Sequence, residues 1–152
     1  MAKHKRAHHG DTALHLQRAL SALIDLSLQA KQAHWNCVGP HFRSVHLQLD
    51  QLVDAVREQS DEIAERMSAL GHSPEGGLAA TAKRSPLEPF RDGFVEAIAA
   101  ATEIARHLRA VVDILHEGIK ALADLDPVSQ DLLIQTSGAI EKQLWMLESL
   151  KR

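Results

Sequence analysis

The sequence is poor in the residues that build disulfide frameworks and β-sheets. It has a single cysteine, Cys37, no tyrosine, and only 3% aromatic residues. One cysteine cannot form a disulfide within the chain, so the disulfide-bonded scaffolds of small secreted proteins are excluded and a reducing compartment is expected. Alanine and leucine are abundant, whereas the β-branched and aromatic residues that strands prefer are scarce. The composition therefore predicts an all-α protein.

The sequence also lacks long apolar runs. None of its hydrophobic stretches approaches the roughly 18 residues that a transmembrane helix needs. The first ten residues, MAKHKRAHHG, are polar and contain no hydrophobic signal-peptide core. We therefore expect a cytoplasmic protein without a membrane partner.

The chain has 152 residues, of which 45% are hydrophobic and 24% charged, and this suits one domain with a sizeable core. Its formal net charge is −3. Lys3, Lys5 and Arg6 give residues 1–10 a side-chain charge of +3, which leaves −6 for residues 11–152. The sequence predicts a flexible basic tail over 1–10 and a folded, acidic domain over 11–152.

Hydrophobic residues recur at intervals of three and four along four segments, the pattern of amphipathic helices. Asp11 or Thr12 is suited to cap the first helix, and Pro127 suits the first turn of the last. The expected helices cover residues 12–36, 41–70, 87–122 and 127–150. The second and third are joined by residues 71–86, a long link rich in glycine and proline. We predict a ferritin-like four-helix bundle with a long crossover between helices two and three.

The second helix carries two pairs of ligand-type side chains. His46 and Asp50 are four residues apart and share one helix face, and so do Asp61 and Glu65. The pairs lie about 16 Å apart along the axis, too far to bind one ion together. Both His46–Glu65 and Asp50–Asp61 have their midpoint at residues 55–56. A two-fold axis there would place one pair beside the other pair of a second chain, and a two-fold dimer would have two such sites.

His34, at the end of the first helix, is suited to add another imidazole to this site. Nitrogen and carboxylate ligands without thiolate fit Fe(II), Mn(II) or Zn(II). The alternative is that these residues only form the solvated face of a long helix. No histidine has a glutamate three residues before it, so the two Glu-x-x-His motifs of single-chain di-iron bundles are absent.

The sequence resembles the Dps family, the ferritin-like DNA-binding proteins from starved cells. The resemblance is carried by KQAHWNCVGPHFRSVHLQLD at 31–50, by DEIAERMSALG at 61–71, and by DLLIQTSGAIEKQLWMLES at 131–149. It implies an inter-subunit ferroxidase site with a shared ligand set. One chain would supply His34, His46 and Asp50, and its mate would supply Asp61 and Glu65.

The resemblance further implies a hollow dodecamer, built from two-fold dimers, that oxidises Fe(II) with hydrogen peroxide and stores ferric mineral. Trp35 matches a tryptophan beside the site, but a buried core aromatic is an equal interpretation. Asp126 and Asp131 resemble acids of an iron-entry pore, and the alternative is that they complement the helix dipole. Asp54 and Glu58 are candidates for mineral nucleation. Cys37 is expected to be a buried, inert thiol.

The basic tail is of a kind that often binds the DNA backbone in this family. Three charges on one tail give little affinity at physiological salt, but twelve tails on one particle would act together. A solubilising arm is the alternative. The main prediction is an iron-oxidising, iron-storing oligomer that protects against peroxide. Its rivals are a nucleoid-structuring protein with a vestigial or zinc-occupied site, and a single-chain di-metal enzyme.

Overall fold

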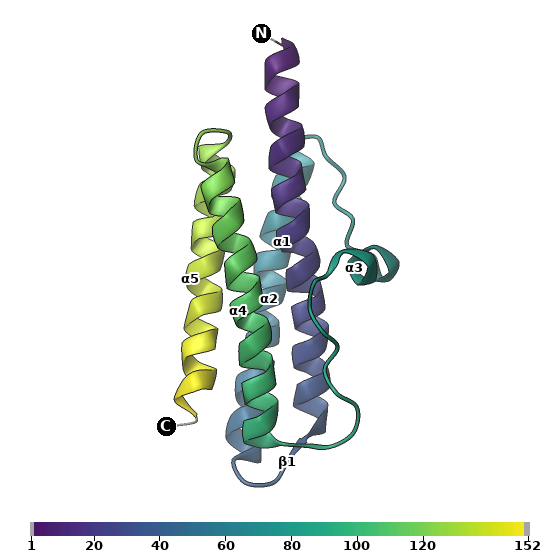
Figure 1. The fold of residues 1–152 in the computed structure, drawn as a ribbon, viewed down its shortest axis with the longest axis vertical. Helices are drawn as coiled ribbons and strands as arrows, with labels where there is room; N and C mark the ends of the chain where they lie inside the picture. Colours follow the sequence, from purple (N-terminus) through teal and green to yellow (C-terminus); the bar gives the residue numbers. More distant parts are fainter. Residues whose placement is uncertain (1, 151–152) are drawn as a thin grey trace.

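The computed structural model describes the backbone of residues 2–150 and the side chains of residues 10–150. Four long helices lie side by side in a bundle (Figure 1). They are α1 (Ala2–Asn36), α2 (Phe42–Ala69), α4 (Ala97–Leu122) and α5 (Pro127–Ser149). Short turns join α1 to α2 and α4 to α5, whereas a long segment crosses from α2 to α4. The predicted all-α bundle with this crossover is confirmed.

The ends of α1, α2 and α5 near the turns match the predicted boundaries to within one residue. The start of the first helix does not, because α1 begins at Ala2, ahead of the start predicted at Asp11 or Thr12. The first nine residues contain no proline, so no proline among them prevents the helix from extending back to Ala2. The side chains of Lys3, Lys5 and Arg6 lie outside the described side chains, and the flexible tail stays a prediction.

The predicted start of the third long helix at residue 87 is wrong. The helix α4 begins ten residues later, and Glu96 caps it by accepting a hydrogen bond from the Ala99 amide at 2.9 Å. Pro86 and Pro89 disfavour helical backbone in the residues before them, and Gly93 has a φ of +81°. Residues 85–94 therefore run as an extended strap.

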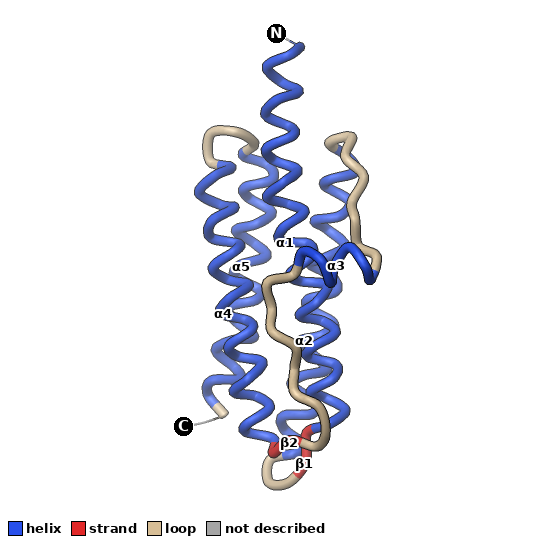
Figure 2. The backbone as a smooth tube through the Cα atoms, turned by 45° about the vertical axis from the view of Figure 1, so that its right-hand side comes forward, coloured by secondary structure: helices blue, strands red, loops and turns tan. Residues whose placement is uncertain are grey.

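The connections between the long helices also contain elements that the sequence did not predict. A short helix, α3 (Leu78–Arg84), lies against α1 (Figure 1). Two strands of two residues each, β1 (Cys37–Val38) and β2 (Val95–Glu96), pair in parallel at one end of the bundle (Figure 2). This pairing joins the end of α1 to the start of α4. Both elements are too short for hydrophobic periodicity to reveal.

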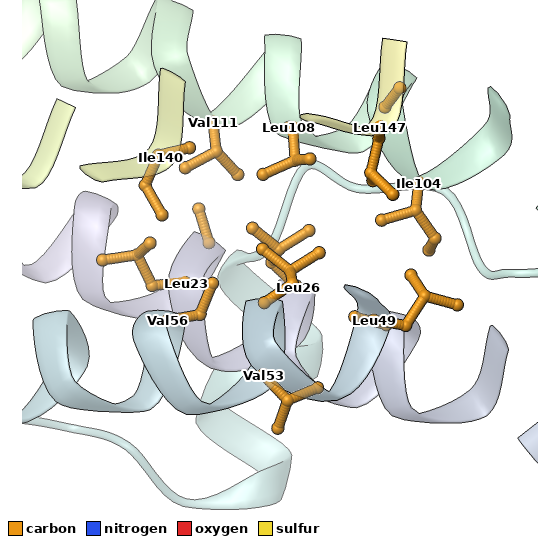
Figure 3. Close-up of a cluster of buried hydrophobic side chains, with 14 of the residues drawn as sticks. Leu23, Leu26, Leu49, Val53, Val56, Ile104, Leu108, Val111, Ile140 and Leu147 are labelled. Atoms are coloured by element: carbon orange, nitrogen blue, oxygen red, sulfur yellow. The ribbon is translucent and has the colours of Figure 1, made fainter. Parts of the chain in front are cut away.

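The core lies between the four helices (Figure 3). The buried side chains labelled there are Leu23 and Leu26 of α1, Leu49, Val53 and Val56 of α2, Ile104, Leu108 and Val111 of α4, and Ile140 and Leu147 of α5. Their spacing of three, four or seven residues within each helix gives each helix one buried stripe. Burying each aliphatic side chain stabilises the fold by about 1.5–3 kcal/mol. Among residues 2–150, no helix has the length and hydrophobicity to cross a bilayer.

Candidate metal centre

Two imidazoles meet where α1 ends and α2 begins. His34 lies in the last turn of α1, and His46 lies in the second turn of α2. The turn between the helices uses two left-handed residues, Gly39 at φ +84° and His41 at φ +65°. Histidine is among the few residues with a side chain that occur there at appreciable frequency. The turn reverses the chain and stacks the two rings, with centroids 3.6 Å apart and planes inclined by 20°.

The two histidines fix each other through reciprocal hydrogen bonds. Nδ1 of His34 lies 2.8 Å from the carbonyl oxygen of His46, and Nδ1 of His46 lies 2.9 Å from the carbonyl oxygen of His34. Because a carbonyl oxygen only accepts, each Nδ1 carries the proton. In the neutral rings the lone pair is therefore on Nε2, where it is available to a metal ion. The pair is pre-organised within a single chain.

Asp50 lies beside this pair, one helical turn after His46. Its Oδ1 is 3.9 Å from Nε2 of His34 and forms an ion pair with Nζ of Lys31. The hydrogen bond from Lys31 is the main cause that lowers the pKa of the Asp50 carboxyl, and the nearby histidines act in the same direction. The structure thus brings three of the five predicted ligands together and holds the carboxylate ionised with a lysine.

The other two predicted ligands lie elsewhere on α2. Asp61 and Glu65 are exposed, and within the described part of the chain neither has a hydrogen bond or an ion pair. Asp61 borders a groove of about 380 Å³ between α1 and α2, together with Arg57 and apolar side chains that include Ile24. Glu65 borders a different groove, between α2 and α5.

Among the side chains of residues 10–150, no three His, Cys, Asp or Glu residues are arranged to hold a metal ion. His34, His46 and Asp50 are included in this result: they lie near one another but do not form a three-ligand cluster. Helix geometry keeps Asp61 and Glu65 away from them within one chain. The complete five-residue ligand set stays a prediction.

Trp35 and Cys37 flank the histidine pair in different environments. Trp35 is 64% exposed in the single chain, so its interpretation as a buried core aromatic is wrong. Cys37 is buried, as expected, and its Sγ donates a weak hydrogen bond to the carbonyl oxygen of His34 at 3.6 Å. Burial raises the pKa of this thiol, although a backbone hydrogen bond partly opposes the rise.

The two predicted pore acids also differ in environment. Asp126 is the N-cap of α5, since its carboxylate accepts hydrogen bonds from the amide and hydroxyl of Ser129. It also accepts two hydrogen bonds from Arg66, at 2.8 and 3.0 Å. These contacts favour its structural interpretation. Asp131 is exposed, contacts Gln135, and borders the groove that contains Glu65.

The candidates for mineral nucleation, Asp54 and Glu58, are exposed on α2. Lys31 and Arg66 are the functional neighbours that sequence reasoning missed. Lys31 precedes His34 by three residues, and this spacing places both on one helix face. That spacing was a usable signal for the Lys31 contact. No comparable signal links Arg66 to Asp126, which is 60 residues away.

Comparisons with known proteins agree with the bundle and the histidine-bearing helices. The family model "Ferritin-like domain" matches residues 13–152. A DNA protection during starvation protein of Mycolicibacterium smegmatis is 41% identical over 142 residues, covering 91% of this chain and 76% of the relative. The fine tangled pili major subunit of Haemophilus ducreyi is 38% identical over 142 residues, covering 88% and 71%. The solved structure of Mycobacterium smegmatis Dps superimposes with a TM-score of 0.90 at 37% identity, covering 94% of this chain and 87% of that one.

The crossover bundle and the family match define a ferritin-like protein. Within that class, the identity to Dps relatives over most of the chain is decisive. The chain belongs to the Dps family, as the sequence motifs predicted.

Proposed function

We propose that this protein oxidises Fe(II) at sites shared between two chains related by a two-fold axis. One chain supplies His34, His46 and Asp50 to each site, and the partner chain supplies Asp61 and Glu65. The proposal rests mainly on one observation. The first three residues lie near one another at one end of α2, where a carbonyl oxygen holds Nδ1 of each imidazole. The other two lie exposed about 16 Å further along the same helix, without a hydrogen bond or ion pair to any described residue.

The surface around Asp61 supports the two-fold arrangement. The groove beside it is lined mainly by apolar atoms from Leu20, Ile24, Ala64 and Pro74. An apolar groove next to an unpaired carboxylate suits burial against another chain, because packing would remove the apolar surface from water. A second copy supplies both the cover and the complementary ligands, since a two-fold interface places the same patch on each side.

The donor set suits the chemistry of iron as a substrate. Imidazole nitrogens and carboxylates bind Fe(II), and carboxylates favour the product Fe(III) because a harder cation prefers anionic oxygen. Two Fe(II) ions each give one electron to hydrogen peroxide, which takes up two protons and becomes two water molecules. This reaction consumes both partners of hydroxyl-radical formation. Peroxide as the oxidant agrees with the protective role in the names of the Dps relatives.

We further propose that the dimers assemble into a hollow dodecamer in the cytoplasm that stores the ferric product as mineral. Asp131 would line the entry route, and Asp54 and Glu58 would bind ferric ions at the inner surface. The similarity to Dps structures over most of the chain supports this assembly. Size by light scattering, together with iron content after loading, tests it. A monomer or dimer of constant size would contradict the storage role.

The shared site is tested by mixing two inactive variants. One lacks both His34 and His46, and the other lacks both Asp61 and Glu65. Every site in either homodimer is incomplete, so neither variant should oxidise iron at the site. After the two variants are refolded together, half of randomly paired dimers are mixed, and each mixed dimer has one intact site and one doubly damaged site. About one site in four should therefore recover. A site contained in one chain predicts no recovery even when mixed dimers are confirmed by mass spectrometry.

We also propose that Lys3, Lys5 and Arg6 bind the DNA backbone. Each tail neutralising three phosphates would give a slope of about −2.7 in log affinity against log salt concentration. A chain that starts at Asp11 is the matched control in a gel-retardation series at rising salt. Equal retardation by the two chains would show that the tail is not the DNA-binding element.

The alternative function is a nucleoid-structuring protein whose site is vestigial or holds Zn(II), since nitrogen and oxygen ligands also suit zinc. It predicts DNA compaction without Fe(II) oxidation. Fe(II) oxidation with peroxide and with dioxygen, followed to its stoichiometry, separates the two functions and reveals the preferred oxidant. A single-chain di-metal enzyme is disfavoured because the residues described here do not bring a complete ligand set together in one chain.

A further inference from the structure

One buried histidine has no role in the iron site. His107 lies on α4, is only 3% exposed, and neither of its ring nitrogens has a hydrogen-bond partner among the described residues. Leaving a buried polar atom without a hydrogen bond destabilises the fold, so a residue with two such atoms calls for an explanation.

The strap, residues 85–94, is held to the bundle by polar contacts close to His107. They are Ser85 Oγ to Asp25 Oδ2 at 2.5 Å, the Phe90 amide to Gln29 Oε1 at 2.6 Å, and Arg91 Nε to Glu103 Oε2 at 2.7 Å. Two of the acceptors belong to α1 and one belongs to α4. Glu103 is itself only 6% exposed and lies one helical turn before His107. The strap therefore depends on a carboxylate that is next to an unpaired imidazole.

Charged groups surround His107 from all three elements at this junction. Glu103 and Arg106 are on α4, Asp25 is on α1, and Glu88 is on the strap. Burial lowers the pKa of His107, and the positive charge of Arg106 lowers it further. The carboxylates of Glu103, Asp25 and Glu88 oppose this shift without cancelling it. Burial and Arg106 therefore favour the neutral form of the ring.

We propose that His107 is a proton-operated release for the strap: protonation of its imidazole opens the contacts that hold residues 85–94 against α1 and α4. The proton comes from solvent and adds to the free ring nitrogen, so that both nitrogens become donors. The imidazolium then competes with Arg91 for Glu103, and opening the strap gives it access to water. A proton fits this position better than a metal ion, because the side chains of residues 10–150 contain no set of three ligands for one.

The direction of the effect follows from linkage. The open form has the ordinary histidine pKa of about 6.5, whereas the closed form has a lower one. Between about pH 6.5 and the lower pKa of the closed form, the open form therefore binds more protons than the closed form. Over that range the closed form becomes less stable relative to the open form as pH falls, and below it the difference stays constant. For each pH unit by which the closed-form pKa lies below the open-form pKa, the ratio of open to closed protein at low pH rises tenfold.

Hydrogen exchange of two amides reports the opening directly, because Phe90 and Arg91 donate to Gln29 and Glu103 across the contacts in question. After correction for intrinsic rates, their protection in the full chain should fall as the pH is lowered from about 7.5 to about 5, through the ordinary histidine range. The amide of Ile140, in the core on α5, should keep its protection. A parallel fall at Ile140 would mean global unfolding and would overturn the proposal.

Two substitutions remove the titrating group while filling the site differently, His107→Leu and His107→Gln. In either folded variant the acid-dependent fall should vanish. His116→Gln is the matched control on the same helix, since His116 is exposed and contacts Glu141, and it should behave as the wild type. Retention of the fall in the His107 variants would overturn the proposal.

A measurement on the unmodified protein keeps the idea testable if both variants fail to fold. The ring resonances of His107, followed by NMR, should titrate with the same midpoint as the loss of protection at Phe90. A ring that takes up a proton while Phe90 stays protected would also overturn it.

Discussion

The side chains of ligand type at the two ends of α2 differ in the contacts that hold them. At the first end, His46 is stacked on His34, each ring is hydrogen-bonded to the other residue's carbonyl, and Asp50 is held by Lys31. At the second end, Asp61 and Glu65 extend from the helix without a hydrogen bond to any described residue. The ion pair at that end is formed instead by Arg66, which follows Glu65, and Asp126 at the start of α5.

The difference indicates which part of the site a single chain builds. Imidazoles need a defined tautomer and ring orientation to bind a metal, and one chain supplies both through hydrogen bonds. Exposed carboxylates need no such preparation, because two equivalent oxygens allow several binding geometries. We infer that the histidine end fixes the position of iron and that the carboxylate end adapts to it when a partner arrives.

The strongest test removes one ligand from each end. His46→Ala and Asp61→Asn should each slow peroxide-driven Fe(II) oxidation by at least about 100-fold, the upper range for the loss of a supporting residue around a metal. Stopped-flow absorbance measures the rate, and light scattering checks that assembly is retained. Wild-type rates in both assembled variants would contradict the assignment, since neither end of α2 would then belong to the site.

The second test asks whether the Arg66–Asp126 contact at the carboxylate end stabilises the fold. Asp126→Ala removes a helix cap and leaves Arg66 unpaired, so the free energy of unfolding should fall by about 2–3 kcal/mol. Asp131→Ala is the control on the same helix, and its exposed side chain should contribute less than about 0.5 kcal/mol. Chemical denaturation measures both, and equal losses would contradict a capping role.

This second prediction has a pH dependence. Burial alone would raise the pKa of the Asp126 carboxyl, but hydrogen bonds from Ser129 and Arg66 outweigh burial and hold the pKa below its usual value. Its stabilising effect is then complete above about pH 4, the pKa in an unfolded chain, and is lost as pH falls through the folded value. The stability difference between wild type and Asp126→Asn should shrink accordingly in acid.

A smaller effect is expected at the histidine end. Lys31→Gln removes the ammonium group that pairs with Asp50, so a metal ion no longer competes with Lys31 for the carboxylate. We expect Fe(II) to bind several-fold more tightly in anaerobic calorimetry, and Lys31→Arg, which keeps the charge, to stay near wild type. Weaker binding to Lys31→Gln would mean that the lysine supports the bound metal instead of competing with it.

The smallest effect concerns Cys37, which is next to the histidine pair but buried. Because burial raises the pKa of its thiol, little thiolate is present near neutral pH, and alkylation of the folded protein should be slow. Cys37→Ala should leave the rate of iron oxidation within about twofold, as expected for a residue whose side chain is not a ligand. A large loss of rate would give the thiol a part in the chemistry.

The sequence predicted the parts of this molecule that are long or repetitive. Four amphipathic helices and the ligand spacing on α2 are regular patterns, and the turn before α2 is marked by glycine and proline. The proposed dependence on a second chain rests on the rise of the helix, because residues 50 and 61 cannot approach each other within it.

Contacts between distant segments were not predictable in the same way. The prediction of helix from residue 87 was wrong over residues 87–96, a segment that contains Pro89 and Gly93. The parallel pairing of β1 with β2 has no local signal in two residues. The burial of His107 has no local signal either, since its charged surroundings come from α1 and the strap as well as from α4.

The pairing of β1 with β2 has a consequence for how the chain folds. The α1–α2 and α4–α5 hairpins close over short turns, so their contacts form at a small entropy cost. The small sheet joins Cys37 to Val95 and can close only after the whole crossover is in place. We expect the hairpins to form before the folding barrier and the sheet after it. Val95→Ala should therefore accelerate unfolding and leave the folding rate nearly unchanged, whereas a core change in a hairpin, such as Leu49→Ala, should slow folding.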